Sequence, residues 1–163
     1  MSVREIRLYG DPVLKTPSEP IAVIDERIHA LVADLLDTVQ LPGRAGVAAP
    51  QIGVNLRAFS FNVHGEIGYI LNPEIIERSG EVELVDEGCL SVPEQWHPTP
   101  RFGFAKVRGT VLDGSELVLE GDGLMGQMLQ HEVDHLDGYV YLDRLERDER
   151  KLAMSQLRES SWF

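Results

Sequence analysis

The chain has 163 residues, 27 of them acidic and 15 basic, and a formal net charge of −12 at pH 7. This charge argues against a nucleic-acid groove or an anionic membrane surface as the main partner, because both require clustered Lys and Arg side chains. A single cysteine, Cys89, excludes an intramolecular disulfide and favours a reducing compartment. The chain opens without an apolar signal core and has no apolar run that could span a bilayer, so the sequence predicts one cytoplasmic domain over residues 1–163.

The first predicted element is a helix over residues 25–40. Asp25 is placed to cap its start, and Pro42 with Gly43 is placed to end it. The apolar positions that give it helical spacing are Ile28, Leu31, Val32, Leu35, Leu36 and Val39. We expect this helix to pack on the outside of the domain.

Strand-like segments fill the middle of the chain. They cover residues 56–61, 68–71, 75–77, 81–85, 105–112 and 116–120. Trp96 and His97 fall in a polar loop between two of these segments, where a solvated histidine is the simplest interpretation. A charged helix over residues 143–160 ends the chain. Without regular βαβ spacing, the pattern predicts an α+β fold in which a central helix is surrounded by small antiparallel sheets.

Two short stretches carry polar or reactive residues. Residues 46–51 are small, apart from the amide of Gln51, and alone they indicate a tight loop with an exposed glutamine. Cys89 follows Gly88 after a strand, and a lone intracellular cysteine is commonly a small buried hydrophobe. A nucleophile paired with a histidine is another use. We prefer a metal ligand, because two histidines with ligand spacing lack a third partner.

Those histidines lie in residues 130–138, which read QHEVDHLDG. His131 and His135 are four apart on a predicted helix that ends at Gly138, so their imidazoles can bind one metal ion, and Glu132 lies beside it as a general base. Chance occurrence and satisfied core histidines are the alternative explanations of such a five-residue pattern.

The stretches GVAAPQ (46–51), EGCLS (87–91) and QHEVDHLDG together resemble the three signature motifs of the peptide deformylases, as do GDPVL (10–14) and the overall length. The resemblance implies a single catalytic domain that removes the formyl group from the N-terminal formylmethionine of newly made polypeptides and releases formate. It implies Cys89, His131 and His135 as metal ligands, Glu132 as the acid/base for attack by metal-bound water, and Gln51 with the Leu90 N–H as the groups that hold the formyl oxygen.

The remaining roles also come from the resemblance. Gly46 would meet the substrate backbone, and Val85, Leu124 and Met128 would line a slot for the methionine side chain, with Gln127 as a solvated rim residue. Family members characteristically use Fe²⁺, and Ni²⁺, Co²⁺ or Zn²⁺ are alternatives that the ligand types alone do not separate. The basic ribosome-docking helix of some bacterial members is not implied here, because residues 143–163 hold five basic and five acidic side chains.

Arg44 and Asp134 are two further positions with an expected role. Arg44 replaces the glycine that usually begins the first motif, and we expect it to point outward at the mouth of the cleft, where it could attract a peptide carboxylate or pair with an acid. Asp134 is expected to be the structural partner of an arginine such as Arg101.

Two other functions fit part of the pattern. An ordinary zinc peptidase would take its third ligand from a downstream histidine or glutamate, and the C-terminal segment offers only Glu146, Glu149 and Glu159. A closed structural metal site or a binding domain would take four protein ligands, and Glu132 in the position of a base argues against that.

Overall fold

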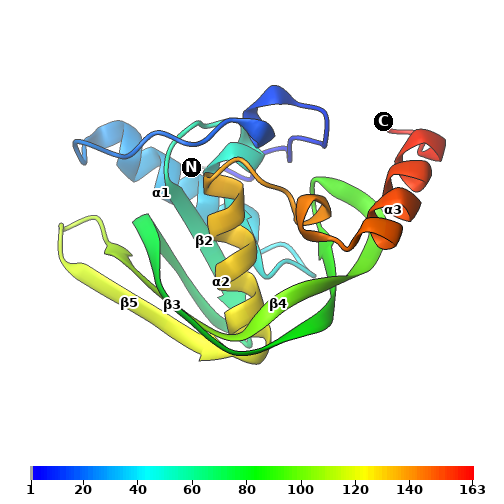
Figure 1. The fold of residues 1–163 in the computed structure, drawn as a ribbon. Coiled ribbons are helices and arrows are strands. Elements are labelled where there is room, and N and C mark those ends of the chain that lie inside the picture. The colour runs from blue at the N-terminus through cyan, green and yellow to red at the C-terminus, as the bar shows by residue number, and fades with distance from the viewer. Residues whose placement is uncertain (1) are drawn as a thin grey trace.

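The computed structural model describes residues 2–163, which form a five-stranded antiparallel sheet with helices on both faces (Figure 1). The strands follow one another in the sheet in chain order, as β1 (Gly46–Ala48), β2 (Ala58–Val63), β3 (Glu66–Cys89), β4 (Val92–Thr110) and β5 (Glu116–Asp122). The helices are α1 (Glu26–Val39), α2 (Gly123–Leu136) and α3 (Arg147–Glu159), with 3-10 turns at Pro12–Lys15, Ala49–Ile52 and Tyr141–Arg144. This confirms the α+β class, although the expected small sheets are joined into one.

Helix α1 forms where its apolar spacing predicts. The Asp25 side chain accepts hydrogen bonds from the N–H groups of Arg27 and Ile28, which otherwise lack a partner at the start of the helix. The buried face of the helix packs on one side of the sheet, and the Ser60 hydroxyl donates to the Leu35 carbonyl at 2.8 Å. The helix therefore covers the face of β2 opposite to that covered by α2.

Helix α2 packs across the other face, as Figure 1 shows. Phe59 and Phe61 alternate with Ala58 and Ser60 along β2, so their rings point to α2. The core that they form with the helix includes Ile70, Val107, Met128, Leu129, Val133 and Leu136. Burying each such side chain contributes about 1.5–3 kcal/mol, which holds α2 firmly at the centre of the fold.

The long hairpin of β3 and β4 corrects two sequence predictions. Segments expected as separate strands are parts of β3, whose register shifts at four places and lets it bend. Trp96 and His97 lie in β4 and not in a loop, and His97 is buried. The neighbouring Pro98 and Pro100 suggested a loop, but β5 pairs with β4 from Phe104 to Thr110, so these prolines lie where β4 has a free edge.

The C-terminal helix is shorter than predicted. Residues 141–144 form a 3-10 turn, and α3 begins only at Arg147 after extended backbone at Leu145 and Glu146. Buried Leu142 and Leu145 pack with Ala153 and Leu157 of α3, so this cluster turns the chain before the helix starts. In residues 2–163 there is no helix with both the length and the apolar character of a membrane span.

Candidate metal centre

The end of α2 is fixed by a glycine. Gly138 has φ +86°, and a Cβ at this position would lie 2.9 Å from the Lys15 carbonyl oxygen, so a side chain would be strained as well as crowded. The prediction that the helix ends here is confirmed. Helix α2 is thus held at its C-terminal end by Gly138 and along its apolar face by the core. This support fixes the positions of the polar side chains on the rest of the helix.

Three side chains converge where α2 faces the end of β3. Single ligand atoms of Cys89, His131 and His135 all lie within 4.8 Å of one another, and Cys89 Sγ is 3.4 Å from His135 Nε2. Both histidines are buried, and Cys89 is half-buried. Cys89 is the last residue of β3, where the sheet register shifts, so the strand delivers its thiol to the helix.

The donor set fits a divalent first-row metal. One thiolate and two imidazoles suit such an ion, and three protein ligands leave a coordination position open. His131 Nδ1 is bound to Glu87 Oε2 at 2.6 Å, which leaves Nε2 available as a ligand atom. Glu132 Oε1 is buried and has no hydrogen-bond partner within residues 2–163. This buried carboxylate oxygen is therefore free to accept a hydrogen bond from a water molecule or a substrate.

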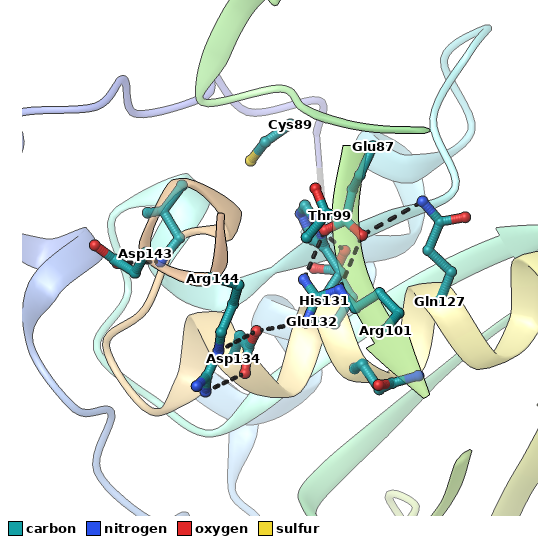
Figure 2. A network of polar contacts seen from close by, with 12 residues as sticks. Glu87, Cys89, Thr99, Arg101, Gln127, His131, Glu132, Asp134, Asp143 and Arg144 are labelled. Atoms are coloured by element: carbon teal, nitrogen blue, oxygen red, sulfur yellow. Dashed lines mark hydrogen bonds and ion pairs between the residues drawn. The ribbon is translucent and has the colours of Figure 1, made fainter. Parts of the chain in front are cut away.

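A chain of charged groups supports His131 (Figure 2). Arg101 donates two hydrogen bonds to Glu87, at 2.9 and 2.6 Å, and a third to Asp134 Oδ2 at 2.8 Å. Arg144 donates to the other oxygen of Asp134 at 3.0 Å. The expected pairing of Asp134 with Arg101 is thus confirmed. The network fixes the ring of His131 through the buried charges of Glu87, Arg101 and Asp134, and the partly exposed Arg144 lies at its outer end.

The two carboxylates nearest to His131 have opposite electrostatic properties. Burial is the largest influence on the pKa of Glu132 and raises it to about 7, against the lowering effect of His131. Burial also tends to raise the pKa of Glu87, but hydrogen bonds from Arg101 and His131 outweigh it and hold that pKa at about 2. Glu87 is therefore an anion at neutral pH, whereas the pKa of Glu132 lies where the group can exchange a proton.

Gly46 makes room for the Glu132 side chain. A Cβ on Gly46 would lie 2.6 Å from Glu132 Oε2 and 2.8 Å from its carboxyl carbon, closer than atoms can approach. Glu132 Oε2 is also 3.9 Å from His131 Nε2. The carboxylate is therefore held between strand β1 and the ligand cluster.

Gln51 is buried at the same site, so the interpretation of its stretch as a loop with an exposed glutamine is wrong. Its Oε1 accepts from the Ala48 N–H at 2.9 Å, and its Nε2 donates to Ser91 Oγ at 3.2 Å and lies 3.7 Å from Cys89 Sγ. These contacts fix the amide so that its nitrogen faces Ser91 and Cys89. Leu90 is half-buried and lines the same cleft as Gln51.

A cleft of about 430 Å³ opens over the cluster. Of the residues expected to contact a substrate, it is lined by Gly46, Gln51, Leu90, Leu124 and Met128, together with Cys89, His131 and Glu132. Val85 is not among its lining residues; it is half-buried and pairs with Thr99 between β3 and β4.

Gln127 and Arg44 also line the cleft, and each is tied to the protein. Gln127 Nε2 donates to the Asp86 carbonyl at 3.1 Å and approaches Glu87 Oε1 at 3.4 Å, so it is a half-buried link between α2 and β3 and not a solvated rim residue. Arg44 donates to the Thr38 carbonyl at 3.0 Å near the end of α1. Among the described residues Arg44 has no ion-pair partner, so of its two expected roles the pairing with an acid is not found, and the attraction of a peptide carboxylate stays a prediction.

Sequence reasoning did not assign a role to Glu87 or Trp96. Glu87 stands two residues before Cys89 on a strand, so both side chains point to the same face, and this spacing was the available signal. Trp96 was placed in a loop, although it pairs with Gly88 across the hairpin and lines the cleft.

Comparison with known proteins gives a consistent result. The sequence profile of one family, described as polypeptide deformylase, matches residues 3–151. The chain is 46% identical to a peptide deformylase of Acidothermus cellulolyticus over 162 residues, which are 99% of this chain and 89% of that protein. It is 40% identical to peptide deformylase 1 of Corynebacterium efficiens over an alignment of 167 positions, which covers 100% of this chain and 99% of that protein.

Solved structures show the same likeness. The crystal structure of a peptide deformylase from Legionella pneumophila aligns with a TM-score of 0.89 and 35% identity, and covers 97% of this chain and 95% of that one. A second, from Synechococcus elongatus in complex with actinonin, aligns with a TM-score of 0.87 and 30% identity, and covers 94% of this chain and 85% of the other.

Proposed function

The chain belongs to the polypeptide deformylase family, and on that premise we propose how its residues remove the formyl group from N-formylmethionyl peptides. It is a metal-dependent hydrolase, and its reaction releases formate. The single observation that carries the assignment of roles is the convergence of Cys89, His131 and His135 beside the buried carboxylate of Glu132.

Cys89, His131 and His135 would hold one divalent ion, and we propose Fe²⁺ as that ion, with Ni²⁺, Co²⁺ and Zn²⁺ as alternatives. When bound, the ion supplies Lewis acidity and makes hydroxide available at neutral pH. The anionic Glu87 favours this arrangement, because it accepts a hydrogen bond from His131 Nδ1–H and so favours the tautomer in which Nε2 is unprotonated and free to bind a metal ion.

Glu132 is the proposed acid and base. With a pKa of about 7 it accepts a proton from the attacking water and returns it to the amine that leaves as the C–N bond breaks. Because the side chain lies against Gly46, its carboxylate is held in place for both transfers. The same group therefore serves both halves of the hydrolysis.

Gln51 and the Leu90 N–H are the proposed donors for the oxyanion that develops on the formyl oxygen. The amide of Gln51 is fixed by Ala48 and Ser91 before any substrate arrives, so it costs little reorganisation during the reaction. Losing one such donor costs about 100-fold in rate in comparable sites.

We propose that Leu124 and Met128 form the apolar wall for the methionine side chain, and that Gly46 meets the substrate backbone. Both wall residues line the cleft one or two turns before His131 on α2. Val85 lies outside the lining, so we do not extend the pocket to it. We further propose that residues 1–163 act as one catalytic domain in the cytoplasm.

The test is formate release from formyl-Met-Ala-Ser by protein prepared without oxygen and loaded separately with iron, nickel or zinc. We expect formate release that disappears in Glu132→Gln, whose amide keeps the shape but not the proton transfer. Folded, metal-loaded protein that binds the peptide and releases no formate would overturn the proposed roles.

A further inference from the structure

Tyr141 is a large side chain that is fully buried beside the candidate metal centre. Its exposed fraction is 0%, and it is not among the described residues that line the catalytic cleft. It begins the 3-10 turn that follows α2, three residues after Gly138. Tyr141 therefore does not reach a bound substrate, and any contribution that it makes to the reaction passes through another residue.

The ring of Tyr141 lies against the ring of His131. Their centroids are 6.2 Å apart and their planes differ by 24°, which is an offset stack. The hydroxyl is turned toward the backbone of β4, where it donates to the Gln95 carbonyl at 3.3 Å. Tyr141 thus presents its aromatic ring, and not its polar end, to His131.

The hydrogen bond from Glu87 does not by itself fix the plane of the His131 ring. It restrains one edge of the ring at Nδ1, but a hydrogen bond keeps most of its strength over about 30° of bending. The χ2 angle of histidine has broad energy wells, so the side chain adds little restraint of its own. A neighbour on the ring face supplies this restraint, because tilting the imidazole would either crowd that neighbour or lose contact with it.

A second imidazole holds Tyr141 in place. The rings of Tyr141 and His97 are 6.3 Å apart, and their planes differ by 31°. Both nitrogens of His97 are bound, Nδ1 to Glu149 Oε2 at 2.6 Å and Nε2 to Gln95 Oε1 at 2.7 Å. Tyr141 is therefore supported by a buried side chain that is itself fixed, and it is not free to move away from His131.

Cys89 packs on the core to which Tyr141 belongs. This buried cluster includes Leu14, Val92 and Leu142, and the half-buried Cys89 lies against it. Removing the tyrosine ring would leave a cavity in the cluster that supports Cys89, on the side where the ring meets His131. Two of the three candidate ligands therefore depend on the packing around Tyr141.

We propose that Tyr141 is a positioning residue for the metal centre, whose ring fixes the plane of the His131 imidazole and so the direction of Nε2. The inference rests on the proposed function, because it takes His131 as a metal ligand. Residues that support the ligands of a metal site typically change the metal affinity by about 10–100-fold. Because Tyr141 acts through packing and not through a hydrogen bond to the ligand, we expect the lower end of that range.

The experiment compares Tyr141→Leu, which removes the ring, with Tyr141→Phe, which keeps the ring and removes the hydroxyl. Each protein is loaded with Co²⁺, whose visible absorption reports the geometry of its ligands, and the affinity is measured by competition with a chromophoric chelator. We expect Tyr141→Leu to bind Co²⁺ about tenfold more weakly and with a shifted spectrum, and Tyr141→Phe to match the parent protein in both. Tyr141→Met is made in parallel, because its flexible side chain fills a cavity better if the leucine variant does not fold.

Two variants control for the loss of a ring and for the loss of core packing. Tyr69→Leu removes a half-buried tyrosine from the core on the α1 side, and Leu157→Ala truncates a buried side chain in the cluster that holds Tyr141. Both should lower the free energy of unfolding and keep the Co²⁺ affinity and spectrum of the parent protein.

Three results would overturn the positioning role while leaving the metal centre intact. They are an unchanged affinity and spectrum in a folded variant without the ring, a loss in Tyr141→Phe as large as that in Tyr141→Leu, and an equal loss in Leu157→Ala. A parent protein that binds no Co²⁺ would overturn the proposed metal centre and the role of Tyr141 with it.

Discussion

Two ion pairs of equal length lie in very different parts of the molecule. Arg101 and Glu87 are 2.6 Å apart with side chains 5% and 2% exposed, beside the metal-ligand candidates. Arg108 and Glu74 are also 2.6 Å apart, but their side chains are 49% and 62% exposed on the far part of the β3–β4 hairpin. The comparison shows that distance alone does not measure what an ion pair contributes, because the environment decides how much water each charge has lost.

The largest expected effect comes from breaking the buried pair. Arg101→Met would leave Glu87 and Asp134 buried without their shared cation, and such breaks destabilise proteins by about 3–5 kcal/mol. We expect a loss of that size in the free energy of unfolding, measured by urea titration with both proteins in the same metal state. A loss within the error of the titration would mean that water replaces the arginine at little cost.

The next effect concerns the geometry of Glu132. Gly46→Ala would force the carboxylate away from its position, because the added Cβ lies 2.6 Å from Glu132 Oε2. A displacement of this kind costs about 100-fold in rate, so we expect kcat to fall by that order with formyl-Met-Ala-Ser.

Gly103→Ala is the matched control for that substitution, because its Cβ would meet only the Glu81 carbonyl at 3.6 Å, an ordinary contact. It should keep the parent rate. If both variants lost activity equally, crowding of Glu132 would not be the cause.

The network also predicts a change in metal affinity. Glu87→Gln keeps the shape of the side chain but removes the anion that binds His131 Nδ1, and losing such a partner typically weakens metal binding about 10–100-fold. Competition with a chromophoric chelator measures this directly.

Glu83→Gln in the same strand is the control, since Glu83 is exposed and its strand partner is the backbone of Arg101. Its metal affinity should match that of the parent protein. An unchanged affinity in Glu87→Gln would show that His131 is oriented by packing alone.

How far the sequence could predict this molecule depends on the range of the interactions involved. Local spacing was sufficient for α1 with its Asp25 cap and for the end of α2 at Gly138, because both depend on neighbours in the chain. The sequence also predicted that Cys89, His131 and His135 lie together, and their ligand atoms do converge. The third ligand could be chosen because the chain has a single cysteine.

The failures concern contacts across the sheet. His97 was expected in a solvated loop, yet it is buried in β4 and bonds Glu149 of α3 at 2.6 Å. Nothing in the local sequence reveals a partner 52 positions away. Pro98 and Pro100 made the segment resemble a loop, because proline is rare within strands. Val85 was placed by resemblance alone, and it is not among the residues that line the cleft.

The smallest effect is expected at the exposed pair. Arg108 and Glu74 stay hydrated, and holding two long side chains in one geometry costs entropy that offsets their attraction. The variants Arg108→Met, Glu74→Gln and their combination should therefore unfold at the same urea midpoint as the parent protein, within error. A double-mutant cycle that found strong coupling at this pair would contradict the view that burial, and not separation, distinguishes it from Arg101 and Glu87.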